Sequence, residues 1–186
     1  MPRRLREVPR EIERLDVAVY AAVAATPTPV LDAGLARLSR AADKGALWFG
    51  VAGLLALGGP RGRRAAVEGL GAQAVTSVVI NLVLKPMGGR HRPDRAAHQV
   101  PVARHVAMPR STSWPSGHAG SAFAFASGVG ASWPAAGLPC SALATLVAYS
   151  RVHTGVHYPL DTIVGSVTGA ALTPIARAAA GRRRRS

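Results

Sequence analysis

The sequence predicts an all-α integral membrane protein, a bundle of about five to six transmembrane helices preceded by an amphipathic N-terminal region. Of its 186 residues 48% are hydrophobic, although the formal net charge is +14. These two properties are compatible because the arginines are clustered and the segments between the clusters are apolar and nearly free of charge. No stretch alternates polar and apolar residues with the period of a β-strand. The basic clusters lie at residues 3–14, 61–64, 90–110 and 182–185.

The N-terminal residues 1–43 form a separate region in this prediction. Arginine and glutamate alternate at its start around apolar residues at helical spacing, which indicates an amphipathic helix facing the cytoplasm. Residues 15–25 are apolar except for Asp16, but a transmembrane helix needs about 20 apolar residues. This run therefore either continues the charged helix or lies partly in the membrane interface. The Thr-Pro-Thr-Pro run at 26–29 must break or bend the helix, and residues 30–43 resume as an amphipathic segment.

A membrane core is expected over residues 44–177, followed by a basic cytoplasmic tail at 178–186. Several of its apolar segments are shorter than the roughly 20 residues of a usual span, so their ends are expected to be buried in protein. Glu68 lies near a basic end of its segment, where it can pair with Arg61 or Arg64. The segments predicted to span the bilayer are 45–59, 65–84, 118–134, 138–150 and 160–177.

Small and aromatic residues support the same arrangement. Gly120 with Ala124, and Gly165 with Gly169, are small-residue pairs four positions apart, which predict close packing between helices. Four aromatic residues fall near the predicted span ends, where interfacial aromatics are typical. They are Trp48, Trp114, Trp133 and Tyr158.

The positions of the basic segments predict how the chain is oriented. A tight basic turn at 60–64 and the arginines at 182–185 lie on one side by the count of crossings, and this side is expected to be cytoplasmic. Both termini are then cytoplasmic in a multi-pass protein of the cell membrane. The loop 85–113 and the stretch 151–158 fall together on the extracytoplasmic face. Loop 85–113 is itself basic, against the charge rule, and a phosphate-binding role would explain this exception.

Composition also argues against other classes of protein. A pI near 11.7 would suggest nucleic-acid binding in a soluble protein. Here the basic clusters are separated by apolar segments, and no basic helix is interleaved with aromatics, so no nucleic-acid partner is expected. Cys140 is the single cysteine, which excludes an intrachain disulfide and a cysteine-based zinc cluster. Nothing in the sequence indicates an oligomeric state.

The stretch from Tyr149 to Asp161 contains side chains whose chemistry suits a phosphate. Pro159 fits the first turn of a helix, which leaves His157 at the helix start and Asp161 close enough to hydrogen-bond its imidazole. Arg151 can bring a guanidinium to the same place. A nucleophile, an orienting carboxylate, a cation and a helix N-terminus then converge. Taken alone, His157 could equally be a surface histidine beside a helix cap.

Two further motifs favour the phosphate interpretation. Lys85 is followed after six residues by Arg92-Pro93, and Pro115-Ser116-Gly117-His118 opens the third predicted span. With the Ser150 to Asp161 stretch, these motifs resemble the three-part pattern of the type 2 phosphatidic acid phosphatase superfamily, also called lipid phosphate phosphatases. The resemblance covers roughly residues 44–175. The chain as a whole is similar to small actinobacterial members of this superfamily.

The resemblance implies a set of phosphate-binding residues. Lys85, Arg92 and Arg151 would neutralise the phosphate and the charge that grows on it in the transition state. The two arginines suit bidentate contacts, and the lysine acts as a point charge. Ser116 and Gly117 stand where a helix begins, so their backbone N–H groups can face the phosphate.

The resemblance also implies the catalytic residues. His157 matches the family nucleophile, which forms a phosphohistidine, and Asp161 would fix its tautomer and stabilise the charged ring. His118 would protonate the leaving oxygen and then activate water for the second step. The remaining histidines lack motif positions and are interpreted as loop or packing residues. They are His91, His98, His105 and His153.

Metal-assisted hydrolysis is the rival chemistry, and it usually needs several carboxylates to hold two cations. After Glu68 the chain has only Asp94 and Asp161, so neither a metal nor another cofactor is expected. Vanadium haloperoxidases share this phosphate-type pocket. They resemble large soluble proteins, unlike this short apolar chain, so this class is not favoured.

The sequence therefore predicts a membrane enzyme that hydrolyses a lipid phosphate or diphosphate, with a polyprenyl diphosphate or a phosphatidate as substrate. The alternative from another class is a non-catalytic membrane protein that binds phospholipid headgroups. Such a protein would be expected to have lost a motif histidine, Lys85 or Arg92, and none is lost.

Overall fold

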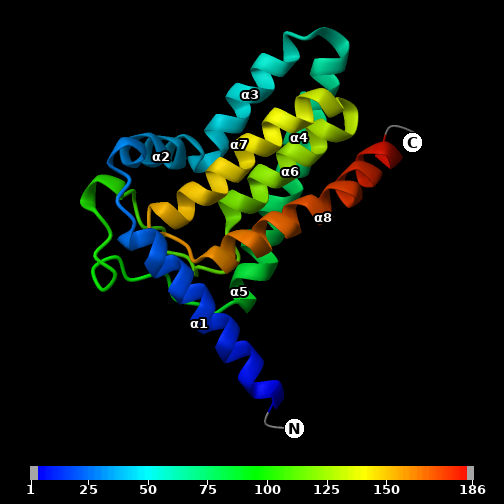
Figure 1. Cartoon of the computed structure of the whole chain (residues 1–186). Coiled ribbons are helices and arrows are strands. Elements are labelled where there is room, and N and C mark those ends of the chain that lie inside the picture. The colour runs from blue at the N-terminus through cyan, green and yellow to red at the C-terminus, as the bar shows by residue number, and fades with distance from the viewer. Residues whose placement is uncertain (1–3, 184–186) are drawn as a thin grey trace.

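The computed structural model describes residues 4–183, which are helical or in loops, with no strand in this range. Figure 1 shows a bundle of helices with a long loop at one end. The elements in chain order are α1 (Arg4–Ala25), α2 (Pro29–Ala41), η1 (Asp43–Gly45), α3 (Ala46–Ala56), α4 (Gly59–Val79), η2 (Ile80–Leu84), α5 (Lys85–Met87), η3 (Val102–Arg104), α6 (Gly117–Ser132), α7 (Pro134–His153) and α8 (Pro159–Arg183).

Helix α6 lies at the centre of the bundle and packs against α4, α7 and α8. Glycines make the close approach of α6 and α8 possible. A Cβ on Gly165 would collide with the carbonyl oxygen of Ser116, and one on Gly169 would collide with that of Gly120. The predicted small-residue contacts are thus confirmed, and they hold the start of α6 against the first half of α8.

The second predicted span is part of a longer helix. Helices α4 and α5 continue through the π-helical turn η2, so that residues Gly59–Met87 form one 29-residue helix. The expected basic turn at 60–64 is wrong, because these residues already form the first turns of α4. Pro60 stands in the first turn, where its missing N–H leaves no intrahelical bond unmade. Glu68 pairs with Arg64 at 2.9 Å, as expected.

The first two helices make a sharply bent pair at the end of the bundle that carries the long loop. Helix α1 is continuous through the charged start and the apolar run, and α1 and α2 are bent by 118° at the Thr-Pro break. Arg104 from the long loop is completely buried and donates to the carbonyl oxygens of Val23 and Thr26, at 3.0 and 2.6 Å. Its Nε also donates to Asp32 of α2 at 2.9 Å. One guanidinium therefore joins the end of α1, the start of α2 and the loop.

The position of Trp48 differs from the predicted one at the membrane interface. It is 1% exposed, and its ring lies 5.0 Å from that of Phe125 in the main apolar core. It is therefore a core residue and not an interfacial aromatic. The sequence position is near a span end, but α3 turns this side chain toward α6 and away from the surface.

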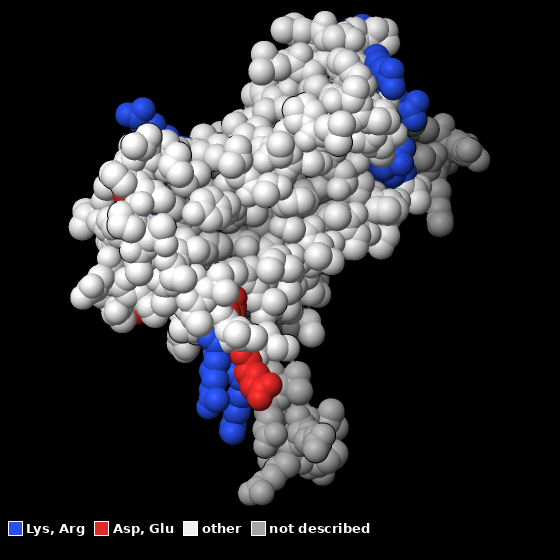
Figure 2. Space-filling view, in the orientation of Figure 1, with Lys and Arg blue, Asp and Glu red and all other residues white. Residues whose placement is uncertain are grey.

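The face of the bundle that Figure 2 presents is largely uncharged. Figure 2 shows a broad surface without charged side chains, with the charged groups gathered toward its ends. Large apolar side chains such as Leu82 and Val167 are more than half exposed, as suits contact with lipid. Within residues 4–183, Gly59–Met87 is the single helix long and apolar enough by itself to cross a membrane, and the bent pair α1–α2 passes the same test together. The number of crossings therefore stays a prediction.

Candidate active site

The three sequence motifs meet at the end of the bundle that carries the loop between α5 and α6. Ser116 caps α6, because its hydroxyl oxygen accepts a hydrogen bond from the N–H of Ala119 at 3.4 Å. The N–H of Ser116 donates to the carbonyl oxygen of Asp161 at 2.9 Å. This bond fixes the start of α6 to the start of α8, so that the second and third motifs are held in register.

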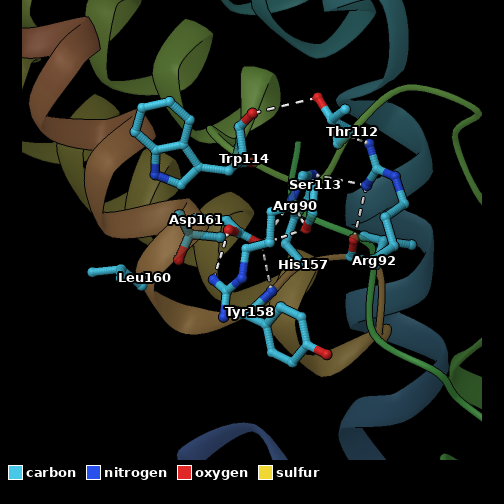
Figure 3. A network of polar contacts seen from close by, with 12 residues as sticks. Arg90, Arg92, Thr112, Ser113, Trp114, His157, Tyr158, Leu160 and Asp161 are labelled. Atoms are coloured by element: carbon cyan, nitrogen blue, oxygen red, sulfur yellow. Dashed lines mark hydrogen bonds and ion pairs between the residues drawn. The ribbon is translucent and has the colours of Figure 1, made fainter. Parts of the chain in front are cut away.

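His157 lies in the turn between α7 and α8 and is 1% exposed. Its Nε2 lies 3.2 Å from Nη1 of Arg92, which can only donate, so Nε2 accepts and presents a lone pair. Its Nδ1 lies 3.6 Å from Oδ2 of Asp161. Burial lowers the pKa of His157 to about 3, so the ring is neutral at physiological pH. Figure 3 shows the imidazole between Arg92 and Asp161. A neutral ring with an accepting Nε2 is the state that a nucleophile requires.

Asp161 is held by several donors in the first turn of α8. Its Oδ2 accepts from the Ser113 hydroxyl and, at 2.9 Å, from the N–H of Tyr158. Its Oδ1 accepts from Nη1 of Arg90 at 2.9 Å. The carboxylate next to His157 is therefore fixed in place and charge-balanced by a cation that the motifs do not include (Figure 3).

Arg90 connects this carboxylate to the first helix. Its Nη2 lies 2.7 Å from Oδ2 of Asp16, and its guanidinium stands 4.2 Å from the ring centre of Tyr158. Asp16 also accepts from the N–H of Leu160 at 2.7 Å, which caps the start of α8. Sequence reasoning missed Arg90 and Ser113. The sequence feature that could have indicated the contact of Asp16 is its position as the single charged residue in the apolar run 15–25.

The predicted phosphate-binding cations lie around His157 and the start of α6. Arg92 is oriented by the carbonyl oxygens of Ser111 and Val156, at 2.9 and 2.8 Å. Lys85 donates to the Ser111 hydroxyl at 3.1 Å, and its Nζ is 3.7 Å from the point where Gly117 would carry a Cβ. Nη2 of Arg92 donates to the same hydroxyl at 3.3 Å, so Arg92 and Lys85 share Ser111 as a partner.

Arg151 approaches from α7 and is 1% exposed. Its Nη1 donates to the hydroxyl of Ser39 in α2 at 2.6 Å. Its Nε has no hydrogen-bond partner among residues 4–183, which leaves a buried donor free for an anion.

His118 stands in the first turn of α6, and its Nε2 lies 2.8 Å from Oδ1 of Asp43. The same carboxylate oxygen is 3.8 Å from Nη1 of Arg151. The hydrogen bond with His118 lowers the pKa of Asp43, which keeps this carboxyl group charged. Asp43 was not predicted, because it lies 75 residues from His118 and belongs to no motif. It orients the second histidine much as Asp161 faces the first.

The comparisons with known proteins agree with this arrangement. A family model described as the PAP2 superfamily matches residues 67–185, more than half of the chain. The chain belongs to the PAP2 superfamily. A decaprenylphosphoryl-5-phosphoribose phosphatase of Mycobacterium tuberculosis is 36% identical over 176 residues, which cover 93% of this chain and 95% of the relative. The phosphatase of the same name from Mycolicibacterium smegmatis is 34% identical over 160 residues, which cover 86% of this chain and 83% of the relative.

Two solved PAP2-type structures have a similar fold. LpxE of Aquifex aeolicus has a TM-score of 0.71 at 21% identity, covering 87% of this chain and 94% of its own. The transmembrane PAP2-type phosphatidylglycerolphosphate phosphatase of Bacillus subtilis has a TM-score of 0.68 at 21% identity, covering 92% of this chain and 87% of its own. The predicted family is confirmed, and with it an enzyme of the lipid phosphate phosphatase type.

Proposed function

We propose that this PAP2 enzyme hydrolyses the phosphate monoester on the sugar of a polyprenylphosphoryl sugar phosphate, through a phosphohistidine at His157 and without a metal ion. The observation that carries the reaction type is the neutral, buried His157, with its accepting Nε2 beside Arg92. The substrate class is supported by the two mycobacterial relatives, whose names specify a decaprenylphosphoryl phosphoribose. It replaces the polyprenyl diphosphate and phosphatidate of the sequence prediction as the first candidate.

The first step follows from the positions of the two histidines. Nε2 of His157 attacks phosphorus, and the bond from phosphorus to the leaving oxygen breaks. His118 gives that oxygen a proton, so the product leaves as an alcohol. Arg92 turns from Nε2 to the phosphate oxygens and is joined there by Lys85 and Arg151, which stabilise the charge of the transition state.

The second step uses the same groups. His118 is now neutral and takes a proton from water, which attacks the phosphorus of the phosphohistidine. The P–N bond breaks and inorganic phosphate is released, with His157 neutral again. Asp161 stabilises the imidazolium character that the ring gains while it carries the phosphoryl group, and Arg90 and Ser113 hold that carboxylate.

Metal independence is tested by phosphate release in detergent. Within the part of the chain that the structure describes, no group of His, Cys, Asp and Glu side chains could hold a metal ion. Activity on the polyprenylphosphoryl sugar phosphate is therefore expected to survive EDTA. Vanadate is expected to inhibit, because it occupies the phosphate site. Loss of activity in EDTA that added magnesium restores would contradict a metal-free reaction, and a protein that binds the lipid without releasing phosphate would support the headgroup-binding alternative.

We also propose that the active site faces away from the cytoplasm in a multi-pass protein of the cell membrane, with both termini inside. Basic residues at 61–64 and 182–185 support this orientation. In a Cys140→Ser background, a membrane-impermeant maleimide is expected to label Ala97→Cys in intact cells. It is expected to label Arg182→Cys only after the membrane is opened. Labelling of Arg182→Cys from outside would reverse the orientation, and the parent without cysteine controls for background.

A further inference from the structure

A polar cavity of about 280 Å³ lies beside His118, between η1, α4 and α6. It adjoins the phosphate site, because His118, Gly117 and Lys85 also line it. None of the proposed steps at phosphorus uses the rest of its wall. That wall includes an amide and a hydroxyl from α4, Gln73 and Ser77, which are unusual groups for a helix of a membrane core.

The polar groups form one face of α4 and its continuation. Gln73, Ser77, Asn81 and Lys85 follow one another at intervals of four residues. Asn81 donates to the carbonyl oxygen of Ser77 at 2.8 Å. Its Oδ1 and the Nζ of Lys85 lie 3.9 and 3.7 Å from the point where Gly117 would carry a Cβ. The face therefore leads from the cavity directly to the phosphate-binding lysine.

The amide of Gln73 lacks a partner although it is buried. The residue is 8% exposed, and its Oε1 accepts no hydrogen bond from residues 4–183. A buried amide oxygen without a donor is costly, and a turn of the amide toward the cavity would let a ligand hydroxyl pair with it. Gly45 keeps room for this amide, because a Cβ there would lie 2.6 Å from Nε2 of Gln73. The φ of Gly45 is +79°, which also favours glycine.

We infer that this cavity binds the leaving group of the reaction and selects one that is rich in hydroxyls, such as the pentose of a polyprenylphosphoryl sugar. This inference rests on the proposed function and assigns residues to its substrate selectivity. The leaving oxygen must emerge beside its proton donor His118, and His118 lines the cavity. Amide and hydroxyl side chains pair with sugar hydroxyls, whereas an acyl or prenyl leaving group requires an apolar wall.

A cation in the wall fits the same leaving group. Lys44 lines the cavity and forms no ion pair within residues 4–183. A polyprenylphosphoryl sugar has a phosphodiester between its sugar and its lipid. This second negative charge would lie on the leaving group, on the side away from the scissile bond, and Lys44 can neutralise it.

The test compares two phosphomonoesters with the same isoprenoid chain, one on a polyprenylphosphoryl pentose and one directly on the prenyl alcohol. Gln73→Leu and Asn81→Leu remove the amides at similar volume. Each is expected to lower the ratio of the two kcat/KM values, pentose over prenyl, by about tenfold to a hundredfold, because one hydroxyl loses its partner. Thr145→Val is the matched control, since it removes a hydroxyl from the exposed face of α7 and is expected to leave the ratio unchanged.

Binding gives a second measurement that does not depend on turnover. The dephosphorylated polyprenylphosphoryl pentose is expected to inhibit the wild type, and its inhibition constant should rise in Gln73→Leu while that of vanadate stays the same. Equal losses on both substrates, or parallel weakening of vanadate, would mean that Gln73 only supports the fold and would overturn the inference. If the wild type releases phosphate from both esters without preferring the pentose, the inference fails and the phosphatase activity stands. If it releases phosphate from neither, the proposed function itself fails.

Discussion

The His157→Ala protein is expected to form no phosphoenzyme with any substrate and to lose all measurable turnover. The reason is that, among the histidines of residues 4–183, only His157 has a ring nitrogen that accepts from Arg92, the proposed phosphate ligand, so its removal leaves no covalent route. Rapid-quench trapping of labelled phosphoenzyme measures this directly. His91→Ala is the control, because it removes an exposed loop histidine outside the motif positions and should trap label like the wild type.

The His118→Ala protein should behave differently in the same assay. It keeps the proposed nucleophile but loses the proposed proton donor, so turnover should fall by about a hundred- to ten-thousand-fold, the range of general acid–base catalysis. A substrate with a very good leaving group needs little protonation. With it, His118→Ala should still form the phosphohistidine and then stall, because water is not activated. Label trapped in His157→Ala but absent in His118→Ala would reverse the two roles.

Replacement of Arg104 with methionine is expected to cause the largest loss of stability. It removes the guanidinium that satisfies the last carbonyl groups of α1 and leaves Asp32 buried without its main cation. Breaking a buried ion pair by removing one partner costs about 3 kcal/mol or more. Thermal unfolding in detergent should show this as a lower melting temperature, with wild-type kcat retained well below the transition.

Arg110→Met provides the comparison for that experiment. It makes the same substitution in the same loop at an exposed position and should change the melting temperature little. An unchanged melting temperature in Arg104→Met would show that the guanidinium is dispensable for the joint between α1 and α2.

Local signals explain how much of the site could be predicted from the sequence. Pro159 indicated the start of α8, and Ser116 the start of α6, because each residue suits a helix terminus by its own backbone and side-chain chemistry. Since the motif residues lie at fixed distances from these starts, their meeting at one end of the bundle followed from the helix count. The α1–α2 bend was equally local, at the Thr-Pro run.

The supporting residues could not be predicted in this way. Asp43 meets His118, and Ser39 meets Arg151, across 75 and 112 residues, and no period in the sequence encodes such pairings. Both come from the first 43 residues, which carry none of the recognised motifs. Trp48 was misplaced for a related reason, because its exposure depends on the rotation of α3 against α6, which hydropathy does not determine.

The cap that Asp16 provides to α8 has a consequence for the order of events during synthesis. The first helix leaves the ribosome with a carboxylate whose partner, the N–H of Leu160, is made 144 residues later. Until α8 has been inserted, Asp16 lacks the N–H of Leu160 as a partner and Arg90 lacks the carboxylate of Asp161. Nascent or truncated chains that lack α8 also lack Asp161 and the start of that helix, so we expect the proposed active site to assemble only after α8 has joined α1.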